Sequence, residues 1–487
     1  MATIDWSQVA QVEPHNVVDW FLYLNHRDLI SEAEDLIREV ENAIQIRPMQ
    51  SAVWAEYAHH RLPSVLLDIL SGPDMFSRDD GGSKSVRYSC RILLLLWACL
   101  RMTTILPLAQ DADDKQCRRA ISDRMERFSA AMWKHRSLLE SQRDVPRLEL
   151  SELDASDPAH FNAFIAFDIL RIGSAIYETE VGETITMATH VAHYLLYLWT
   201  YSPSRSGWQD QAMQLIYRIF EQDFDTDVQD FVRDAILACH KDYPLHIIQK
   251  MAEVMQDRRT LGRDAAILMD VCNAVLVYSG GVLANVNVTH KSIPEGMGLV
   301  PSFLRCGQRQ LCTSAPIDAR ECVRWMFRNL QDMMADVKIR RVVEAQVDRY
   351  AAKYNLPGMI SLAIFEALET EDTTLCLDLL TIYVPSARRV TSNVKHLTEE
   401  LKDTFTSVQS IWHETLDGIY AFKRKSKSAS IAVQQDVQKI LYGWRNYGAI
   451  VGVAEGVGSR RDRFLSSTPS DETAYWRIPK RCFSKAY

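Results

Sequence analysis

The sequence is poor in the residues that build tight turns. Its 487 residues include only 19 glycines and 16 prolines. A β-sandwich or β-barrel needs such residues at many closely spaced turns, so their scarcity disfavours an all-β fold. Hydrophobic residues make up 47% and charged residues 24%, which is the composition of a folded protein. The length allows two or more cores of ordinary size, or one extended helical array.

An excess of basic residues is also missing. Lysine and arginine number 55 against 63 aspartates and glutamates, which gives a formal net charge of −8. This balance gives no reason to expect nucleic acid or an anionic membrane as a partner. The first twenty residues lack a basic segment followed by an apolar core, so we expect neither a signal peptide nor a transit peptide.

No C-x-x-C pair occurs among the ten cysteines. They are scattered along the chain, several of them within apolar helical patterns: Cys90, Cys99, Cys117, Cys239, Cys272, Cys306, Cys312, Cys322, Cys376 and Cys482. This usage is typical of a reducing compartment, where a free cysteine packs as a small apolar residue. We therefore expect a cytoplasmic protein.

The most apolar segment, RILLLLWACLRM, is too short to cross a membrane. Its unbroken apolar run from Ile92 to Leu100 would span roughly 14 Å as a helix, against a hydrocarbon thickness of about 30 Å. Lengthening the run would place Arg101 in mid-membrane and Pro107 within the helix. The segment predicts a buried core helix, and we expect no membrane partner.

Most of the chain has the hydrophobic period of a helix. In QDQAMQLIYRIFEQDF and in DTDVQDFVRDAILACH, apolar residues recur at spacings of three and four, and RDAAILMDVCNAVLVYS is apolar nearly all round. Successive helices of about a dozen residues with short connections predict an all-α fold. An armadillo- or HEAT-like helical array is favoured, with an irregular multi-helix bundle as the alternative and a mostly irregular C-terminal tail.

Breaks in this pattern predict the domain organisation. The polar segment from Ser71 to Ser85 is interpreted as a loop, and SGGVLANVNVTHKSIPEGMGLVPSFLRCGQRQLCTSAP contains many helix breakers. We expect five segments: an N-terminal helical array at 1–278, an irregular connecting segment at 279–316, a second helical block at 317–422, a basic linker with an amphipathic helix at 423–458, and a flexible tail at 459–487.

Cysteine and histidine groups were the candidates for a metal site. Cys306, Cys312 and Cys322 are spaced by six and ten residues, whereas common zinc modules pair ligands two to four residues apart. His190 and His193 share a helix face at i and i+3, but no E-x-x-H or H-E-x-x-H pattern accompanies them. Packing is the favoured role for all five residues, and we expect no metal ligand and no cofactor.

The remaining candidates are weaker. His59 and His60, like Cys239 and His240, are adjacent in sequence and are expected to point to different faces. Gly456 and Gly458 lack the strand and the third glycine of a dinucleotide site. Three acidic groups lack the partner motif of a magnesium-dependent terpene cyclase: Asp79 with Asp80, Asp113 with Asp114, and Asp223 to Asp227. No catalytic or cofactor-binding residue is assigned.

The segment GWRNYGAIVGVAEGVGSRRDRF resembles a region of fungal helical-repeat proteins that carry a C-terminal MYND-type zinc finger. The matching features are Trp444, Tyr447-Gly448, Val451-Gly452, Arg460-Arg461 and Cys482, and HYLLYLWTYSPSRSGWQDQAMQLIYRIF is similar to their N-terminal helical region. The resemblance implies a protein–protein contact role. The finger's run of cysteines is absent, and because one thiolate cannot close a tetrahedral site, no zinc is expected.

These observations favour a non-enzymatic interaction or scaffold protein of helical-repeat type. Its partner would be a protein, bound as a peptide or helix in a groove to which Trp199, Tyr201 and Trp208 contribute. An enzyme with an unrecognised all-helical active site is the alternative. The basic run 423–427 also has the pattern of a nuclear-localisation patch, which leaves a nuclear location open.

Overall fold

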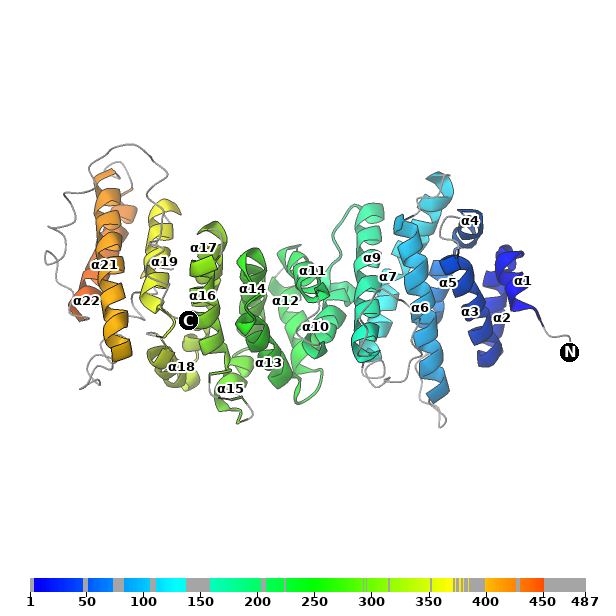
Figure 1. The fold of residues 1–487 in the computed structure, drawn as a ribbon, viewed down its shortest axis with the longest axis horizontal. Coiled ribbons are helices and arrows are strands. Elements are labelled where there is room, and N and C mark those ends of the chain that lie inside the picture. Colours follow the sequence, from blue (N-terminus) through cyan, green and yellow to red (C-terminus); the bar gives the residue numbers. More distant parts are fainter. Residues whose placement is uncertain are drawn as a thin grey trace. The chain divides into compact units, whose positions relative to one another are not determined.

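A computed structural model describes most of the chain as helix (Figure 1). The described residues are 4–46, 51–72, 83–105, 111–136, 158–202, 207–222, 225–291, 293–294, 296–313, 316–350, 353–370, 373, 376–377, 380, 384, 399–425 and 430–450. Within these ranges every regular element is a helix and none is a strand. The predicted all-α class is confirmed for this part of the chain.

The first of two compact units comprises Met1–His240. Its helices are α1 (Trp6–Gln11), η1 (Pro14–Asn16), α2 (Val17–His26), α3 (Ile30–Ile46), α4 (Ser51–His59), α5 (Leu62–Leu70), α6 (Ser83–Ile105), α7 (Asp111–Lys134), α9 (Pro158–Val181), η2 (Met187–Thr189), α10 (Val191–Tyr201), α11 (Trp208–Gln222), α12 (Asp225–Val232) and the π-helix η3 (Arg233–Leu237). Each layer packs on the next: α3 on α6, α6 and α7 on α9, and α9 on α10 and α11.

The second unit comprises Lys241–Tyr487. Its helices are α13 (Tyr243–Gln256), α14 (Gly262–Tyr278), α15 (Val282–Thr289), α16 (Leu299–Thr313), α17 (Pro316–Ala335), α18 (Val337–Tyr350), α19 (Leu356–Thr370), α21 (Glu399–Lys425) and α22 (Ile431–Ile450). Helices α13 and α14 pack on α16 and α17, which pack on α19; α19 packs on α21, and α21 on α22. Each unit is therefore an array of layered helices, as the hydrophobic periodicity predicts.

The boundary between the units differs from the predicted one. The chain divides at His240 and Lys241, whereas the sequence pattern placed the break at 279–316. Helices α13 and α14, predicted to close the first array, instead pack on α16 and α17 and belong to the second unit. The hydrophobic stripe of a helix shows that it packs against something, but it does not show against what.

The segment 279–316 is not irregular, because it contains α15 and α16. Pro301 suggested a helix break, yet it lies in the first turn of α16, where proline is tolerated since its missing N–H would have no intrahelical partner. The backbone N–H of Leu299 donates instead to Asn287 Oδ1 at 2.8 Å. Val300, Phe303 and Cys306 are fully buried, so this segment forms part of the core.

The apolar run in α6 is a core helix, as predicted. Eight of its nine residues from Ile92 to Leu100 are buried. No helix in the described part of the chain is both long enough and apolar enough to cross a membrane.

The predicted basic linker starts inside a helix. Lys423 lies in the last turn of α21 and donates to Gln438 Oε1 on α22 at 2.7 Å, so α21 extends beyond the predicted end of the second block. The amphipathic helix expected after it is α22. The predicted tail at 459–487, and most of the predicted loop from Ser71 to Ser85, lie outside the described residues.

Helices α21 and α22 are joined by two tryptophans that exchange hydrogen bonds. The indole N–H of Trp412 donates to the carbonyl of Trp444 at 2.8 Å, and that of Trp444 donates to the carbonyl of Trp412 at 3.1 Å. Both rings are buried, and Tyr447 contacts Trp444 at 5.2 Å between centroids. We call this arrangement the tryptophan clasp. It gives Trp444 and Tyr447, two residues of the GWRNYG pattern, a role in packing.

A buried carboxyl group lies between α3 and α6. Glu41 is 4% exposed, its Oε2 lies 3.7 Å from Arg91 Nη1, and its Oε1 has no hydrogen-bond partner among the described residues. Burial raises the pKa of Glu41 to about 7, against the lowering effect of Arg91 and Arg38. In the folded state the carboxyl group of Glu41 therefore stays protonated up to about pH 7, whereas an ordinary glutamate is ionised above about pH 4.5.

Compared with the wild type, Glu41→Gln should lose less stability as the pH rises from 5 to 8. Because the folded-state pKa is raised, the stabilisation from Glu41 is fully present below pH 4.5 and is lost as the pH rises through about 7. The loss amounts to about 3 kcal/mol at most. Urea unfolding at pH 5 and pH 8 measures it, with Glu32→Gln on the exposed face of α3 as the control. The same change of unfolding free energy between pH 5 and pH 8 in the wild type and in Glu41→Gln would contradict this prediction.

Candidate functional site

His190 and His193 meet at the start of α10, but in a packing role. His190 has a φ of 60° and precedes the first turn, and its ring lies 4.8 Å from that of His193. His193 is 5% exposed and contacts the rings of Trp133 and Phe231 at 5.5 and 4.7 Å. Burial, with smaller contributions from His190 and Arg136, lowers its pKa to about 3. Among the described residues no group of three or more His, Cys, Asp or Glu is placed to hold a metal ion.

The two pairs of sequence neighbours, His59 with His60 and Cys239 with His240, have different surroundings. The rings of His59 and His60 do meet, edge to face at 5.1 Å, because α4 ends at His59 and the backbone turns at Arg61 with a φ of 58°. The expectation that these two rings point apart was wrong. His240 Nε2 lies 2.7 Å from the hydroxyl of Tyr201, while Cys239 is half-buried.

Several sequence candidates cannot be placed. Asp79, Asp80, Asp223, Gly456, Gly458 and Cys482 lie outside the described residues. Asp113, Asp114 and Asp225 lie in α7 and α12, and Cys312 lies in α16, but their side chains are not among those described.

The core of the second unit brings together two of the three clustered cysteines. Cys306 on α16 and Cys322 on α17 are both fully buried, and the thiol of Cys322 donates a hydrogen bond to the sulfur of Cys306. Arg309 Nη2 and Gln310 Nε2 approach the same sulfur at 3.5 and 3.7 Å. The Cys306 sulfur is thus surrounded by three donors, one of which carries a positive charge. We call these four residues the thiol cluster.

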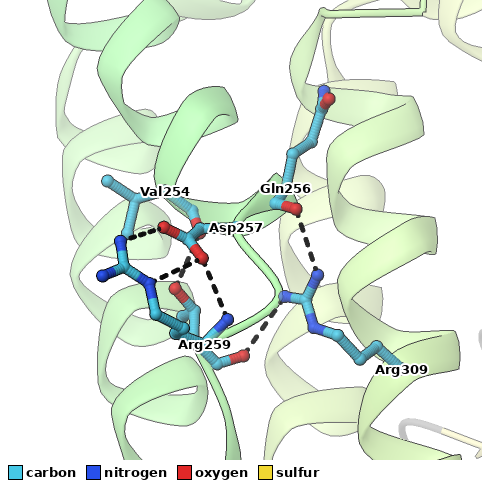
Figure 2. Close-up of polar contacts among 6 residues, drawn as sticks. Val254, Gln256, Asp257, Arg259 and Arg309 are labelled. Carbon is cyan, nitrogen blue, oxygen red and sulfur yellow. Dashed lines mark hydrogen bonds and ion pairs between the residues drawn. The ribbon is translucent and has the colours of Figure 1, made fainter. Parts of the chain in front are cut away.

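Arg309 and Gln310 also hold the connection between α13 and α14. Figure 2 shows Arg309 reaching from α16 to this connection, where it donates to the carbonyls of Gln256 at 3.4 Å and Thr260 at 3.2 Å. It also donates to the carbonyl of Met255 at 2.7 Å. The carbonyls of Met255 and Gln256 lie in the last turn of α13, where they lack intrahelical partners, and that of Thr260 lies in the connection itself.

Gln310 completes the connection from the same helix. Its Nε2 donates to the Thr260 carbonyl at 3.1 Å, and its Oε1 accepts from the N–H of Gly262, the first residue of α14, at 2.7 Å. Next to it, Asp257 pairs with Arg259 at 2.6 Å (Figure 2), which lowers the pKa of Asp257. The thiol cluster is therefore rigidly tied to the backbone of the neighbouring layer.

Cys306 differs chemically from the other buried thiols. Burial alone raises the pKa of Cys90 to about 12, and burial is also the main reason why the pKa of Cys272 and Cys376 is raised. The hydrogen bond from Cys322, together with Arg309 and Gln310, outweighs burial at Cys306 and lowers its pKa below that of an ordinary thiol. The thiolate is the nucleophilic form of cysteine. The surroundings of Cys306 favour its thiolate, so we expect it to be more reactive than Cys90, Cys272 and Cys376.

The first unit carries a row of aromatic rings on α1 and α2. Asp5 caps α1 through bonds to the N–H groups of Ser7 and Gln8, which sets Trp6 at the first position of the helix. The ring of Trp6 contacts Trp20 on α2 at 5.3 Å, and Trp20 contacts Tyr23 at 5.8 Å. Trp6, Trp20 and Tyr23 are called the aromatic row.

This row faces away from the core. Val17, Phe21 and Leu24 form the buried face of α2, whereas Tyr23 is 49% exposed and the two indoles are half-buried. The guanidinium of Arg27 lies 5.9 Å from the centre of the Tyr23 ring. Figure 1 shows α1 and α2 as the outermost helices at this end of the first unit.

The predicted aromatic groove does not form from the residues proposed for it. Trp199 is 1% exposed and Trp208 is 6% exposed, so both are core residues. Trp208 stacks on Phe167 at 5.1 Å, which explains its burial. Only Tyr201, at 38% exposure, remains at the surface.

The sequence contains spacings that point to parts of the thiol cluster and of the aromatic row. The order C-x-x-R-Q at Cys306, Arg309 and Gln310 puts both donors one turn from the thiol. Trp20 and Tyr23 are likewise three residues apart on one helix. What the sequence did not show is that Cys322 faces Cys306, or that Trp6 reaches Trp20, because these contacts join different helices.

Comparisons with known proteins give no family. No family model matches the chain, and no curated protein matches it. A solved structure described as a circular tandem repeat protein with novel repeat topology and enhanced subunit contact surfaces aligns with 92% of this chain and 98% of its own, at 9% identity and a TM-score of 0.21. A TM-score this low supports no argument about this chain. Since no family model matches, the resemblance to the MYND-finger group stays a prediction.

Proposed function

We propose that this protein is a non-enzymatic scaffold that binds another protein through the aromatic row. The observation that carries the proposal is the chain of ring contacts from Trp6 through Trp20 to Tyr23 on an exposed helix flank. Tryptophan, tyrosine and arginine are the residues that most often dominate the binding energy of protein interfaces. Arg27 beside Tyr23 completes that set.

The position of the row in the array supports the same function. Helical arrays normally end in layers whose outer face is polar, because an apolar end would associate. The outer hairpin here exposes large apolar side chains instead: Ile4 at 43%, Val12 at 70%, Leu22 at 48% and Tyr23 at 49%. The partner that fits is a protein segment with apolar side chains and an acidic group for Arg27. Nucleic acid and membranes have no part in the proposal, which places the protein in the cytoplasm or the nucleus.

Substitution of Tyr23 should weaken partner binding without unfolding the protein. Tyr23→Ala removes an exposed ring, so the fold should persist, while partner affinity should fall by about tenfold or more. The measurement is quantitative co-purification of partners with the full-length tagged chain, followed by the Kd of the purified complex. Tyr442→Ala is the matched control, because Tyr442 on α22 is 72% exposed but lies outside the row. Unchanged partner recovery with Tyr23→Ala would refute the proposal.

A further inference from the structure

We propose that Cys306 and Cys322 form a redox-active dithiol, which a hydroperoxide oxidises to a reversible disulfide between α16 and α17. This site is separate from the aromatic row, and the proposal does not depend on the scaffold function. Four observations carry it: the thiol–thiol hydrogen bond, the donors around Cys306, the close approach of the two helices, and the contrast with other buried cysteines.

Helices α16 and α17 lie close together at this point. Gly307 follows Cys306, and a Cβ at Gly307 would lie only 2.6 Å from the sulfur of Met326 on α17. Met326 is one turn from Cys322, so the contact lies on the helix face that carries Cys322. The absence of a side chain at Gly307 therefore lets α16 and α17 approach each other beside the two thiols, and a disulfide between helices needs such an approach.

Arg309 and Gln310 prepare one sulfur for attack. Their side chains are held in place by the carbonyls of Met255, Gln256 and Thr260 and by the N–H of Gly262, so they cannot turn away from Cys306. A fixed positive charge and two further donors favour the thiolate of Cys306 over its thiol. Cys322 keeps its proton, which it donates to Cys306. One partner is therefore set as the nucleophile and the other as the resolving thiol.

The oxidation balances with hydrogen peroxide as the oxidant. The Cys306 sulfur attacks one peroxide oxygen, the O–O bond breaks, and the departing hydroxide takes up the proton lost by Cys306 to give water. The Cys322 sulfur then attacks the resulting sulfenic sulfur, the S–O bond breaks, and the second hydroxide takes the Cys322 proton. Two thiols lose two electrons, one peroxide gains them, and two waters form. The oxidant is close to water in size, so local opening of the hairpin is sufficient for its entry.

Peptide mapping of the full-length wild-type chain tests the proposal. Trypsin cleaves after Arg305, Arg309, Arg320 and Arg324, so the three cysteines of this region fall on separate peptides: CGQR with Cys306, QLCTSAPIDAR with Cys312, and ECVR with Cys322. The native protein is treated with hydrogen peroxide, its remaining thiols are alkylated in denaturant, and the digest is analysed by mass spectrometry. We expect CGQR linked to ECVR as the main disulfide product, and its loss after dithiothreitol.

Two controls sharpen the result. Cys99 and Cys117 are a second pair of buried thiols, and burial is the main cause that raises the pKa of Cys99. Their peptides, ILLLLWACLR and QCR, should be linked at less than about a tenth of the CGQR–ECVR level. Arg309→Lys keeps the charge and the cleavage site but cannot span the same acceptors, and it should slow linkage by about threefold or more. If this variant fails to fold, the wild-type comparison of the two pairs decides.

Two results would overturn the proposal. One is that Cys306 and Cys322 are both alkylated after a peroxide dose that links Cys99 to Cys117. The other is that Cys306 links mainly to Cys312 or Cys272, which would show that the hydrogen-bonded pair is not the reactive one.

Discussion

Gly448→Ala should destabilise the second unit by about 3 kcal/mol, because a methyl group at this position enters the tryptophan clasp. A Cβ at Gly448 would lie 2.3 Å from Trp412 Cε2 and 2.4 Å from its Nε1. The indole is 1% exposed and its N–H is bound to the Trp444 carbonyl, so it cannot move away without losing both packing and hydrogen bond. Urea unfolding gives the free energy, and hydrogen exchange of peptides from α21 and α22 locates the loss.

Gly443→Ala is the matched control on the same helix. A Cβ there would lie 3.2 Å from Leu380 Cδ1, the end of a flexible side chain that can give way. Since alanine is a better helix former than glycine by up to about 1 kcal/mol, this variant should be as stable as the wild type or slightly more so. Equal effects of the two substitutions would show that the clasp does not constrain α22.

Acid should destabilise the first unit through His193. The pKa of His193 is lowered to about 3 in the folded state, against 6.5 for an ordinary histidine. Between these values the unfolded chain binds more protons, so the contribution of His193 to stability is present above pH 6.5 and is lost as the pH falls. The loss is about 2 kcal/mol at pH 5 and approaches about 5 kcal/mol near pH 3.

His193→Phe should remove this dependence, because phenylalanine keeps an aromatic ring against Trp133 and Phe231 but does not titrate. The quantity to compare is the difference in unfolding free energy between pH 7 and pH 5, for the wild type, His193→Phe and the exposed-site control His26→Gln. Glu41 changes stability in the opposite direction over this range, so each variant is compared with the wild type. On lowering the pH from 7 to 5, only His193→Phe should retain about 2 kcal/mol that the wild type loses. If the change in unfolding free energy between pH 7 and pH 5 is the same in His193→Phe as in the wild type, the buried imidazole does not contribute to it.

The helices and their buried faces could be predicted from hydrophobic period alone. In α11, Ala212, Leu215, Ile216 and Ile219 are buried as the spacing indicates. In α14, which is apolar nearly all round, nine of the 17 residues are buried, and Val277 is 45% exposed. These features depend on neighbours three and four residues apart, which a sequence displays directly.

Contacts between helices could not be predicted in this way. The burial of Trp199 and Trp208 follows from the layers stacked over them, and both were expected at the surface. The GWRNYG segment was noticed as a family resemblance, whereas the structure shows Trp444 and Tyr447 buried in the tryptophan clasp and leaves no space for a side chain at Gly448. Likewise, the spacing of Cys306 and Cys322 argued against zinc but gave no sign of their hydrogen bond.

From the sequence alone, Cys482 is interpreted as a lone thiol and not as a metal ligand. It lies outside the described residues, and the absence of a family match leaves its relation to the MYND-finger group as a prediction.

Site-specific photo-cross-linking tests the proposed scaffold function most directly. A photoreactive phenylalanine analogue replaces Tyr23 in the aromatic row or, as a control, Tyr442 on α22; both side chains are exposed. After irradiation in cells, we expect position 23 to yield a defined covalent complex with one protein, and Trp20→Ala to reduce its yield. Position 442 should not form this complex. No cross-linked protein at position 23, or the same products at both positions, would contradict the account.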